Sequence, residues 1–323
     1  MNTQSKRSQQ SNLSHHGVIT ELGTLLNTRH WAQRLKLYSR QAARNMMLGN
    51  SSSRFRGRGM EFEEVRRYQP GDDIRTIDWK VSARAQGTYT KLFCEERERP
   101  CHIILDQRSR LFFGSSKQFK SVLAAEIAAA ISWAALSGGD RVGGQVFGDT
   151  LELDTRARRS RRTVLSYIHD IHQLNTRLSE RFSKQTAKHD SLPDKTTSIA
   201  QSLQECDRIT RPGTAIFIIS DFHDFDEVAA KALSTLSKHS DISMIQVTDA
   251  LEEQLPISGN VAISNGLLSS RVNVSKKLQQ KYLLDKEAQQ QLLKTSVTRA
   301  KALFTKIDTS ISAQRALMNI FGR

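Results

Sequence analysis

Two aspartates that follow apolar stretches are the first candidates for chemistry in this sequence. Residues 101–105 lead into Asp106, and residues 214–220 lead into Asp221. A third polar residue, Thr197, begins a segment with a helical pattern that is expected to reach the same edge of a sheet. Two carboxylates and a hydroxyl are the oxygen ligands that Mg²⁺ prefers. These residue types therefore point to a magnesium-type site with Asp106, Thr197 and Asp221 as its ligands.

Other kinds of chemistry have weaker support from the residue pattern. His223 lies between Asp221 and Asp224, an arrangement that suits hydrolytic metal chemistry. A lone histidine in a loop after a strand, however, more often has no catalytic role. Ser109 and Ser220 lack a visible base and the GxSxG elbow of a catalytic serine. The sequence contains no Walker A motif, so ATP hydrolysis is expected only of a partner.

The stretch from about 100 to 248 must position these residues, and it alternates in the manner of an α/β domain. Short strands that are apolar on both faces alternate with helical patterns, which is typical of a mainly parallel sheet covered on both sides. Such sheets bind ligands beyond the carboxyl ends of their strands, near a switch in strand order. The strands are predicted at 101–106, 141–147, 214–221 and 242–247, and the helices at 117–136, 158–172, 197–209 and 227–238.

The flanking segments are expected to extend this domain at both ends. A helix is predicted at 27–48 and a charged β-hairpin at 60–96. A second hairpin is predicted around Asn265-Gly266, because this pair suits a type I′ turn, and it is followed by helices at 276–304 and 310–321. The predicted regions are a disordered tail (1–26), an N-terminal helix with a charged hairpin extension (27–98), the α/β domain (99–250) and a C-terminal hairpin and helical segment (251–323).

Composition limits the classes of partner. The chain has 323 residues and a formal charge of +15, which suits an anionic partner. Its densest basic cluster, residues 156–162, has no interleaved aromatic residues, so we expect no specific nucleic-acid binding. The N-terminus lacks an apolar signal core, and the longest apolar run, 122–136, is too short to span a bilayer. We therefore expect a cytoplasmic protein without a transmembrane segment.

The order of a strand ending in Asp, a helix, a Thr-led helix and a strand ending in Ser-Asp resembles a von Willebrand factor A-type domain. That family has a metal-ion-dependent adhesion site whose first loop reads Asp-x-Ser-x-Ser, whereas this chain has Asp106-Gln107-Arg108-Ser109-Arg110. A guanidinium offers a metal no lone pair, and its charge repels one. We interpret the site as degenerate, with Arg108 or Arg110 paired to Asp106 or Asp221 in place of the cation. Mg²⁺ is kept as the alternative, and no other cofactor is expected.

A second resemblance covers about residues 55 to 250. The stretch from Glu61 to Arg84 reads EFEEVRRYQPGDDIRTIDWKVSAR and is similar to the signature of the domain of unknown function fifty-eight family. Members carry this signature just ahead of a von Willebrand-type domain and are commonly encoded beside MoxR-type AAA+ ATPases. The resemblance implies such an ATPase and a client protein as partners, in protein maturation or complex assembly.

The charges of that stretch are nearly balanced, which favours a hydrogen-bonded network over a nucleic-acid surface. Trp79 supplies apolar area that is expected to pin the segment down. Glu126 falls on the apolar stripe of the 117–136 helix, so its carboxylate must be paired, and we expect an arginine of residues 66–84 to reach it. The predicted structural network comprises Arg66, Arg67, Asp72, Arg75, Asp78, Trp79, Arg84 and Glu126.

Together these patterns predict a non-enzymatic adaptor with a von Willebrand factor A-like, doubly wound α/β domain. Its partner-docking face is expected at the carboxyl edge of the sheet, at Asp106, Arg108, Arg110, Thr197 and Asp221. The expected partners are a MoxR-type AAA+ ATPase and an unknown client protein. The alternative from another class is a basic nucleic-acid or anionic-surface binding protein, whose affinity would fall steeply with salt.

Overall fold

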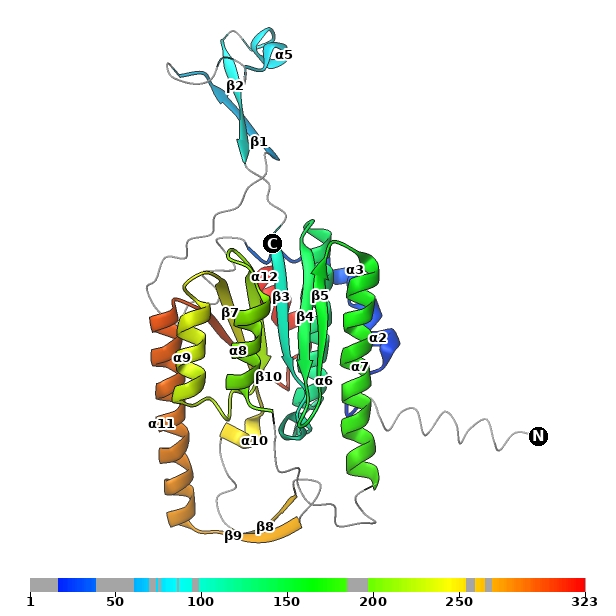
Figure 1. Cartoon of the computed structure of the whole chain (residues 1–323), viewed down its shortest axis with the longest axis vertical. Helices are drawn as coiled ribbons and strands as arrows, with labels where there is room; N and C mark the ends of the chain where they lie inside the picture. Colours follow the sequence, from blue (N-terminus) through cyan, green and yellow to red (C-terminus); the bar gives the residue numbers. More distant parts are fainter. Residues whose placement is uncertain are drawn as a thin grey trace, which may run out of the picture. The chain divides into compact units, whose positions relative to one another are not determined.

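A six-stranded sheet forms the centre of the larger part of the chain (Figure 1). The computed structural model describes residues 17–38, 61–69, 74, 77–85, 87–94, 99–184, 197–253, 259–264 and 269–322. The strand order is β10-β7-β6-β3-β4-β5, and every neighbouring pair is parallel except β4 and β5. The strands are β3 (Pro100–Asp106), β4 (Arg141–Phe147), β5 (Glu152–Arg158), β6 (Ala215–Ser220), β7 (Asp241–Thr248) and β10 (Leu303–Asp308).

The strand order reverses between β3 and β6. From β3 the chain builds outward through β4 and β5, then crosses to the other side of β3 and continues through β6, β7 and β10. The carboxyl ends of β3 and β6 therefore flank a switch in strand order, which is where open α/β sheets bind ligands. Asp106 is the last residue of β3, and Asp221 follows directly after β6.

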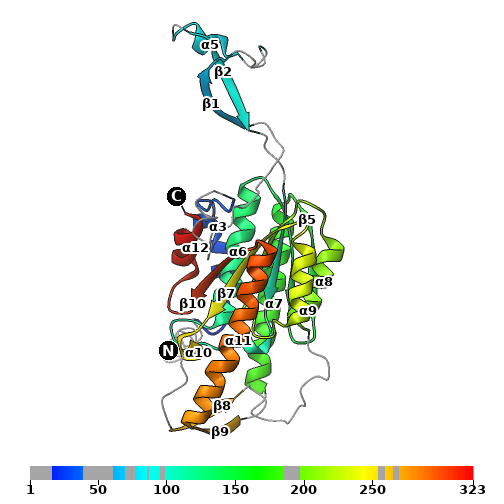
Figure 2. The same ribbon diagram turned by 90° about the vertical axis from the view of Figure 1, so that its left-hand side faces the viewer.

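Helices cover both faces of the sheet, as expected (Figure 2). On one face α6 packs against α2, α3, α7 and α12, and on the other face α9 packs against α8 and α11. The α/β class, the mainly parallel sheet and its two helical layers are thus confirmed. The helices are α2 (Leu22–Asn27), α3 (Arg29–Ala32), α6 (Lys120–Ser137), α7 (Arg161–Lys184), α8 (Ile199–Ile209), α9 (Glu227–Leu236), α11 (Lys276–Ala300) and α12 (Ala313–Phe321).

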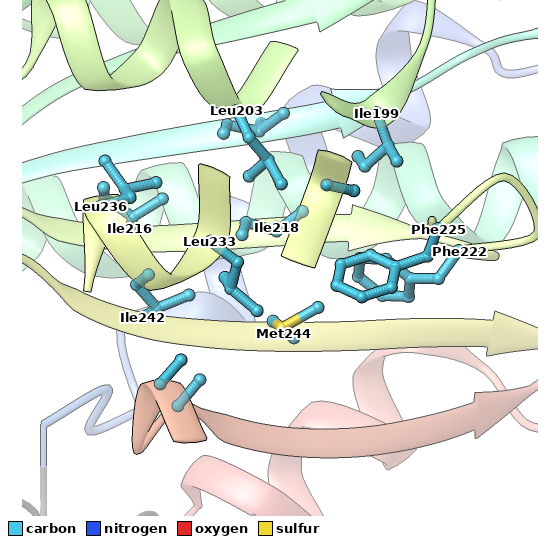
Figure 3. Close-up of a cluster of buried hydrophobic side chains, with 14 of the residues drawn as sticks. Ile199, Leu203, Ile216, Ile218, Phe222, Phe225, Leu233, Leu236, Ile242 and Met244 are labelled. Atoms are coloured by element: carbon cyan, nitrogen blue, oxygen red, sulfur yellow. The ribbon is translucent and has the colours of Figure 1, made fainter. Parts of the chain in front are cut away.

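The core beneath α8 and α9 is apolar and closely packed (Figure 3). Leu203 of α8 and Leu233 of α9 are fully buried against Ile216 and Ile218 of β6 and Met244 of β7. Because each large aliphatic side chain that is fully buried contributes about 1.5–3 kcal/mol, this layer fixes the position of the loops that leave β6 and enter α8.

Among the described residues, α6 alone has the length and hydropathy of a membrane-crossing helix. Its residues from 120 to 137 are 83% buried inside the fold, between the sheet and the N-terminal and C-terminal helices. The apolar composition of α6 is therefore accounted for by its central place in the core.

The N-terminal region differs from the prediction. Residues from Gly17 onward belong to the fold, whereas 1–26 were expected to form a disordered tail. Thr20 is tied to α7, because its backbone N donates to Asn175 Oδ1 at 2.8 Å, and Leu25 of α2 is fully buried. The predicted 27–48 helix is also wrong within the described residues, since α3 ends at Ala32. These short helices form because their apolar residues cover α6.

Two edge strands were not predicted. β5, Glu152–Arg158, ends at the first residue of the helix predicted at 158–172, and that helix begins only at Arg161 and continues to Lys184. β10, Leu303–Asp308, starts within the last two residues of the helix predicted at 276–304 and pairs with β7. In both strands buried residues are mixed with exposed ones, so their sequences lack the apolar runs of the central strands.

Arg54–Arg99 form a compact unit of their own, so the predicted 27–98 region is divided differently. In this unit β1 (Glu61–Arg67) pairs antiparallel with β2 (Tyr89–Cys94), which confirms the charged hairpin. A short helix, α5 (Trp79–Ser82), lies between them. In the larger unit, β8 (Gly259–Ser264) and β9 (Ser269–Val274) form the second predicted hairpin, whose Asn-Gly turn lies outside the described residues.

Candidate functional site

The site at the strand switch is built around an ion pair between Asp106 and Arg108. Asp106 is fully buried, and only 7% of Arg108 is exposed. Arg108 Nε donates to Asp106 Oδ1 at 2.9 Å, and Nη2 donates to Oδ2 at 2.7 Å. The guanidinium also lies over the ring of Phe147, 5.0 Å from its centroid. This planar, two-point contact holds the cationic group at the end of β3.

The same guanidinium binds a second carboxylate and a loop before α8. Arg108 Nη1 and Nη2 contact the two carboxylate oxygens of Asp224 at 2.5 and 2.8 Å. Nη1 also donates to the carbonyl oxygen of Thr197 at 3.1 Å. Asp224 in turn accepts from the backbone N of Ile199, the first residue of α8. Arg108 thereby joins the segments that follow β3, follow β6 and precede α8.

The loop that carries Asp224 has a defined and unusual conformation. Phe222 has a φ of 54°, in the left-handed region that a bulky residue rarely adopts. Its side chain is buried and meets Phe225 edge-on, with 6.4 Å between ring centroids. The apolar burial of Phe222 and Phe225 offsets this backbone strain and directs Asp224 toward Arg108.

Hydrogen bonding and charge set the ionisation of this cluster. Burial raises the pKa of the Asp106 carboxyl, and the Arg108 charge opposes that rise. Burial also acts to raise the pKa of Asp224, but hydrogen bonds from Arg108 hold it below its ordinary value. For Arg108, burial acts to lower the pKa, and the charge of Asp106 outweighs it. The guanidinium therefore stays charged and compensates both carboxylates.

A second buried cation neutralises Asp221. Lys120, at the start of α6, is fully buried, and its Nζ lies 3.1 Å from Asp221 Oδ2 and 2.5 Å from Glu252 Oε1. Burial acts to lower the pKa of Lys120, but the charges of Asp221 and Glu252 raise it above its ordinary value. Sequence reasoning missed Lys120 and Glu252. A lysine at the first position of an otherwise apolar helix was the available signal.

A third aspartate, also missed, follows the next strand of the sheet. Asp249 comes directly after β7 and is buried. It accepts hydrogen bonds from the backbone N and the hydroxyl of Ser115 and from the hydroxyl of Thr309. Burial acts to raise the pKa of Asp249, and these hydrogen bonds hold it below its ordinary value. Asp249 thus fastens the loop after β3 to the end of β10.

The residues at this edge do not fit a divalent metal ion. Asp106 accepts from the backbone N, Nε and Nη2 of Arg108 and from the hydroxyl of Ser220. These four bonds use the roughly four lone-pair directions of a carboxylate. Among the described residues, no group of three or more His, Cys, Asp or Glu side chains is placed to hold a metal. The guanidinium of Arg108 takes the position that a cation would need beside Asp106.

The predicted metal ligands are thus separated by two protein cations. Asp106 pairs with Arg108, Asp221 pairs with Lys120, and Thr197 contacts Arg108 through its backbone carbonyl. Thr197 also does not begin the helix as predicted. α8 starts at Ile199 because Ser198 caps it in a capping box with Gln201.

Arg110 does not join the ion pairs described above but lies at the wall of a groove outside them. The groove encloses about 840 Å³ and runs from the loop after β6 to α11. Its floor includes Asp221 and Asp224, and α11 contributes Tyr282 and Asp285. Of the five residues predicted for partner docking, Arg110 and Asp221 line this groove, whereas Arg108 lies beneath Asp224.

The predicted structural network falls mostly in the smaller unit. Asp78 caps α5 by accepting from the backbone N of Lys80 and of Val81 at 3.0 and 3.1 Å. Trp79 is 69% exposed, so the expectation that it pins the segment down is not met within that unit. It stands at the first position of a four-residue helix that has no buried residue. Arg66 donates to the carbonyl of Arg67 at 3.1 Å.

The remaining members of that network have different outcomes. Asp72 and Arg75 lie outside the described residues, and Arg84 is exposed. Glu126 is half-buried on α6 and lines a small pocket with Thr20 and Thr24 of the N-terminal segment. Its predicted pairing with an arginine of residues 66–84 would join the two units and stays a prediction.

Curated relatives share part of this sequence. The chain is 29% identical over 231 residues to "Uncharacterized protein Rv1480" of Mycobacterium tuberculosis (strain ATCC 25618 / H37Rv). The match covers 72% of this chain and 68% of the relative, and "Uncharacterized protein Mb1516" of Mycobacterium bovis matches equally well. The names of these relatives state no activity.

Solved structures show only a slight likeness. The conserved hypothetical protein BatB from Bacteroides thetaiotaomicron aligns with 16% identity and a TM-score of 0.41, over 69% of this chain and 96% of that one. An aerotolerance-related membrane protein from Bacteroides fragilis NCTC 9343 aligns with 17% identity and a TM-score of 0.39, over 69% and 98%. The strand order of the chain itself defines the fold.

A family model matches most of the chain. It covers residues 64–291, which include the second half of β1, the whole of β2 and the strand switch with Asp106, Arg108 and Asp224. Because this match spans well over half of the sequence, and because it begins within the stretch whose resemblance was noted, the chain belongs to the family described as protein of unknown function DUF58.

Proposed function

We propose that this protein is a non-enzymatic adaptor whose carboxyl-edge groove docks a segment of a partner polypeptide. The observation that carries the proposal is the buried guanidinium of Arg108, which fills the cation position beside Asp106. The partner suggested by the family resemblance is a MoxR-type AAA+ ATPase. In this role the protein presents a client to the ATPase or couples the two, and ATP hydrolysis belongs to the partner.

The hydroxyl groups at this edge support a binding role over a catalytic one. Ser220 donates its hydroxyl to Asp106 at 2.7 Å, and Ser109 lies 3.1 Å from Asp149 Oδ1. Each hydroxyl is bonded to a carboxylate that the fold also uses for structure, whereas a nucleophilic serine needs a base that is free to take its proton. The edge is thus a rigid, charge-compensated platform.

The charge of the groove favours a basic partner segment. Two of its exposed carboxylates, Glu227 and Asp285, belong to α9 and α11, and Asp226 lies beside Glu227. The cations of the groove wall are Arg110 and Lys286. On a chain of net charge +15, the exposed carboxylates of Asp226, Glu227 and Asp285 make this groove a local acidic site. Lysine or arginine side chains of a docking segment complement it.

A pull-down from native cells at moderate salt tests this proposal. The wild-type chain is expected to retain an AAA+ ATPase, and Glu227→Lys with Asp285→Lys is expected to lose it because the groove charge is reversed. Glu287→Lys is the matched control, since Glu287 is exposed on the same helix but does not line the groove. Absence of an ATPase, or equal retention by all three proteins, would contradict the proposal.

The basic surface supports one alternative function. Arg156 and Arg158 at the end of β5 are exposed, as are Arg161 and Arg162 at the start of α7. Such a cluster suits nucleic acid or an anionic surface. If this is the function, binding to generic duplex DNA or to anionic vesicles falls log-linearly with salt concentration and weakens when Arg161 and Arg162 are changed to Gln. The Glu227→Lys, Asp285→Lys variant would then bind at least as well as wild type.

A further inference from the structure

A second cavity lies at the opposite edge of the sheet from the groove. It encloses about 450 Å³ where the parallel strands begin, beside Pro100 of β3, Arg141 of β4 and Thr214 just before β6. Its other walls are β5 and the end of α8 at Ile209. This volume lies in the range of pockets that hold small organic ligands, about 300–1,000 Å³.

A bulge in β5 shapes this cavity. Gly144 pairs with Thr155 and Val142 pairs with Arg158, so β5 carries an extra residue in this interval and its ladder is interrupted. A Cβ at Gly143 would lie 2.5 Å from Ala157 N and 2.6 Å from Thr155 O. Glycine therefore permits the close approach of the bulge to β4, and the bulge places Arg156 and Ala157 in the cavity wall.

The cavity contains a buried polar group that the fold leaves unused. His102 of β3 is 5% exposed and lines the cavity, and its Nε2 has no hydrogen-bond partner among the described residues. Gln145 Oε1, on the neighbouring strand, is also without one there. Nε2 itself is shielded from solvent, so His102 contributes its imidazole ring to the cavity wall.

His102 is neutral at physiological pH. Burial lowers the pKa of His102 to about 4, and the neighbouring Gln145 side chain only partly opposes that shift. A neutral imidazole in the wall avoids the desolvation penalty of a buried charge.

The rim of the cavity is basic. Arg141, Arg156 and Arg211 line it from three different segments, and all three are exposed. Within the described part of the chain, none of their side chains forms an ion pair. Asp154 is the one acidic residue of the lining, and burial raises the pKa of its carboxyl. With three guanidinium groups and one carboxylate in its lining, the cavity favours a negatively charged ligand.

We propose that this cavity binds a small organic anion, a phosphate or carboxylate on an apolar body. The apolar body lies against Pro100, Ala157 and Ile209, the arginines of the rim bind the anionic group, and the imidazole ring of His102 forms part of the wall. This site is separate from the carboxyl-edge groove and does not depend on the adaptor proposal.

Calorimetric titration of the full chain at about 0.15 M salt tests the proposal, with phenyl phosphate and benzoate as probes and benzyl alcohol as the neutral control. At least one anion is expected to bind with a dissociation constant of about 1 mM or tighter, and benzyl alcohol more weakly. Arg156→Gln with Arg211→Gln is expected to weaken binding about tenfold or more, whereas Arg162→Gln, outside the cavity, leaves it unchanged. The ratio of phosphate to carboxylate affinity identifies the anionic group.

His102 gives an independent readout. Its imidazole resonances are expected to shift when the anion binds, because His102 lines the cavity. Failure of both anions to bind would overturn the proposal. Binding that is equally strong in the Arg156→Gln, Arg211→Gln variant, or that leaves His102 unshifted, would also overturn it by placing the anion elsewhere on the basic surface.

Discussion

Replacement of Arg108 by methionine is the most informative perturbation of the strand switch. Methionine keeps an unbranched apolar stem but removes the guanidinium, with its contact to Phe147 and all five side-chain hydrogen bonds that Arg108 donates. Asp106, which is fully buried, then keeps only the hydroxyl of Ser220 and a backbone N as partners. Asp224 is less affected, because 27% of its side chain is exposed and water can reach it.

The magnitude follows from this burial. Removing one partner of a buried ion pair costs about 3–5 kcal/mol, because the remaining charge is uncompensated in a low-dielectric setting. The carboxylate of Asp106 would be left fully buried, and that of Asp224 only partly buried. We therefore expect Arg108→Met to lower the free energy of unfolding by about 3–5 kcal/mol. Arg108→Lys keeps the charge but not the planar two-point contact, and its loss is expected to be smaller.

Urea unfolding followed by circular dichroism measures these differences, and a double-mutant cycle assigns them. Asp106→Asn removes the buried charge and keeps a group that can bond to Ser220. The variant with both changes is therefore expected to lose less than the sum of the single losses, by about 0.5–3 kcal/mol. A loss below about 1 kcal/mol for Arg108→Met, or a strictly additive cycle, would refute the reasoning, since exposed pairs behave in that way.

Three further predictions concern other parts of the fold. Lys120→Met removes the cation that pairs with Asp221 and Glu252, and it is expected to lower the free energy of unfolding by about 3–5 kcal/mol in the same urea assay. An unchanged free energy of unfolding would contradict this prediction and mean that water screens the ion pairs. Asp249 has a depressed pKa, so its stabilisation is complete above its ordinary value of 3.8 and is lost as pH falls below it. Asp249→Asn should thus lower the free energy of unfolding by about 1–3 kcal/mol at pH 7. The difference in stability between this variant and wild type should become smaller between about pH 5 and 2, and a difference that does not depend on pH would contradict a depressed pKa for Asp249. Gly143→Ala drives a Cβ into the backbone of β5 and should destabilise by about 1–3 kcal/mol, while Gly23→Ala, in a helix with open space around it, should stabilise slightly; similar melting temperatures for both would exclude the close approach.

The central strands were predictable because they are buried on both faces. β3, β6 and β7 are buried along nearly their whole length, and the apolar runs of β3 and β6, each followed by an aspartate, mark a parallel sheet and its carboxyl edge. β5 and β10 were missed because an edge strand is only partly buried, so its residues alternate or mix with charges. In β10 the sequence LFTKID also follows a long helical pattern without a break by glycine or proline.

The site was predictable in part for a similar reason. Asp106 and Asp221 follow strands, and strand order alone places them at one edge, where the two arginines of the first loop argued against a metal. Sequence could not choose between Arg108 and Arg110, because that choice depends on how the loop turns after β3. The position of Lys120 at the start of an apolar helix is a visible signal, but its pairing with Asp221, like that of Asp224 with Arg108, joins separate elements and cannot be read from spacing along the chain.

The presence of an internal cation in place of a metal is most directly tested by calorimetric titration of the chain with Mn²⁺ and with Mg²⁺. We expect no saturable binding up to about 1 mM of either ion, in wild type and in Asp106→Asn alike, because Arg108 already occupies the carboxylate. Binding of either ion at millimolar concentration or tighter that is lost in Asp106→Asn would contradict this account.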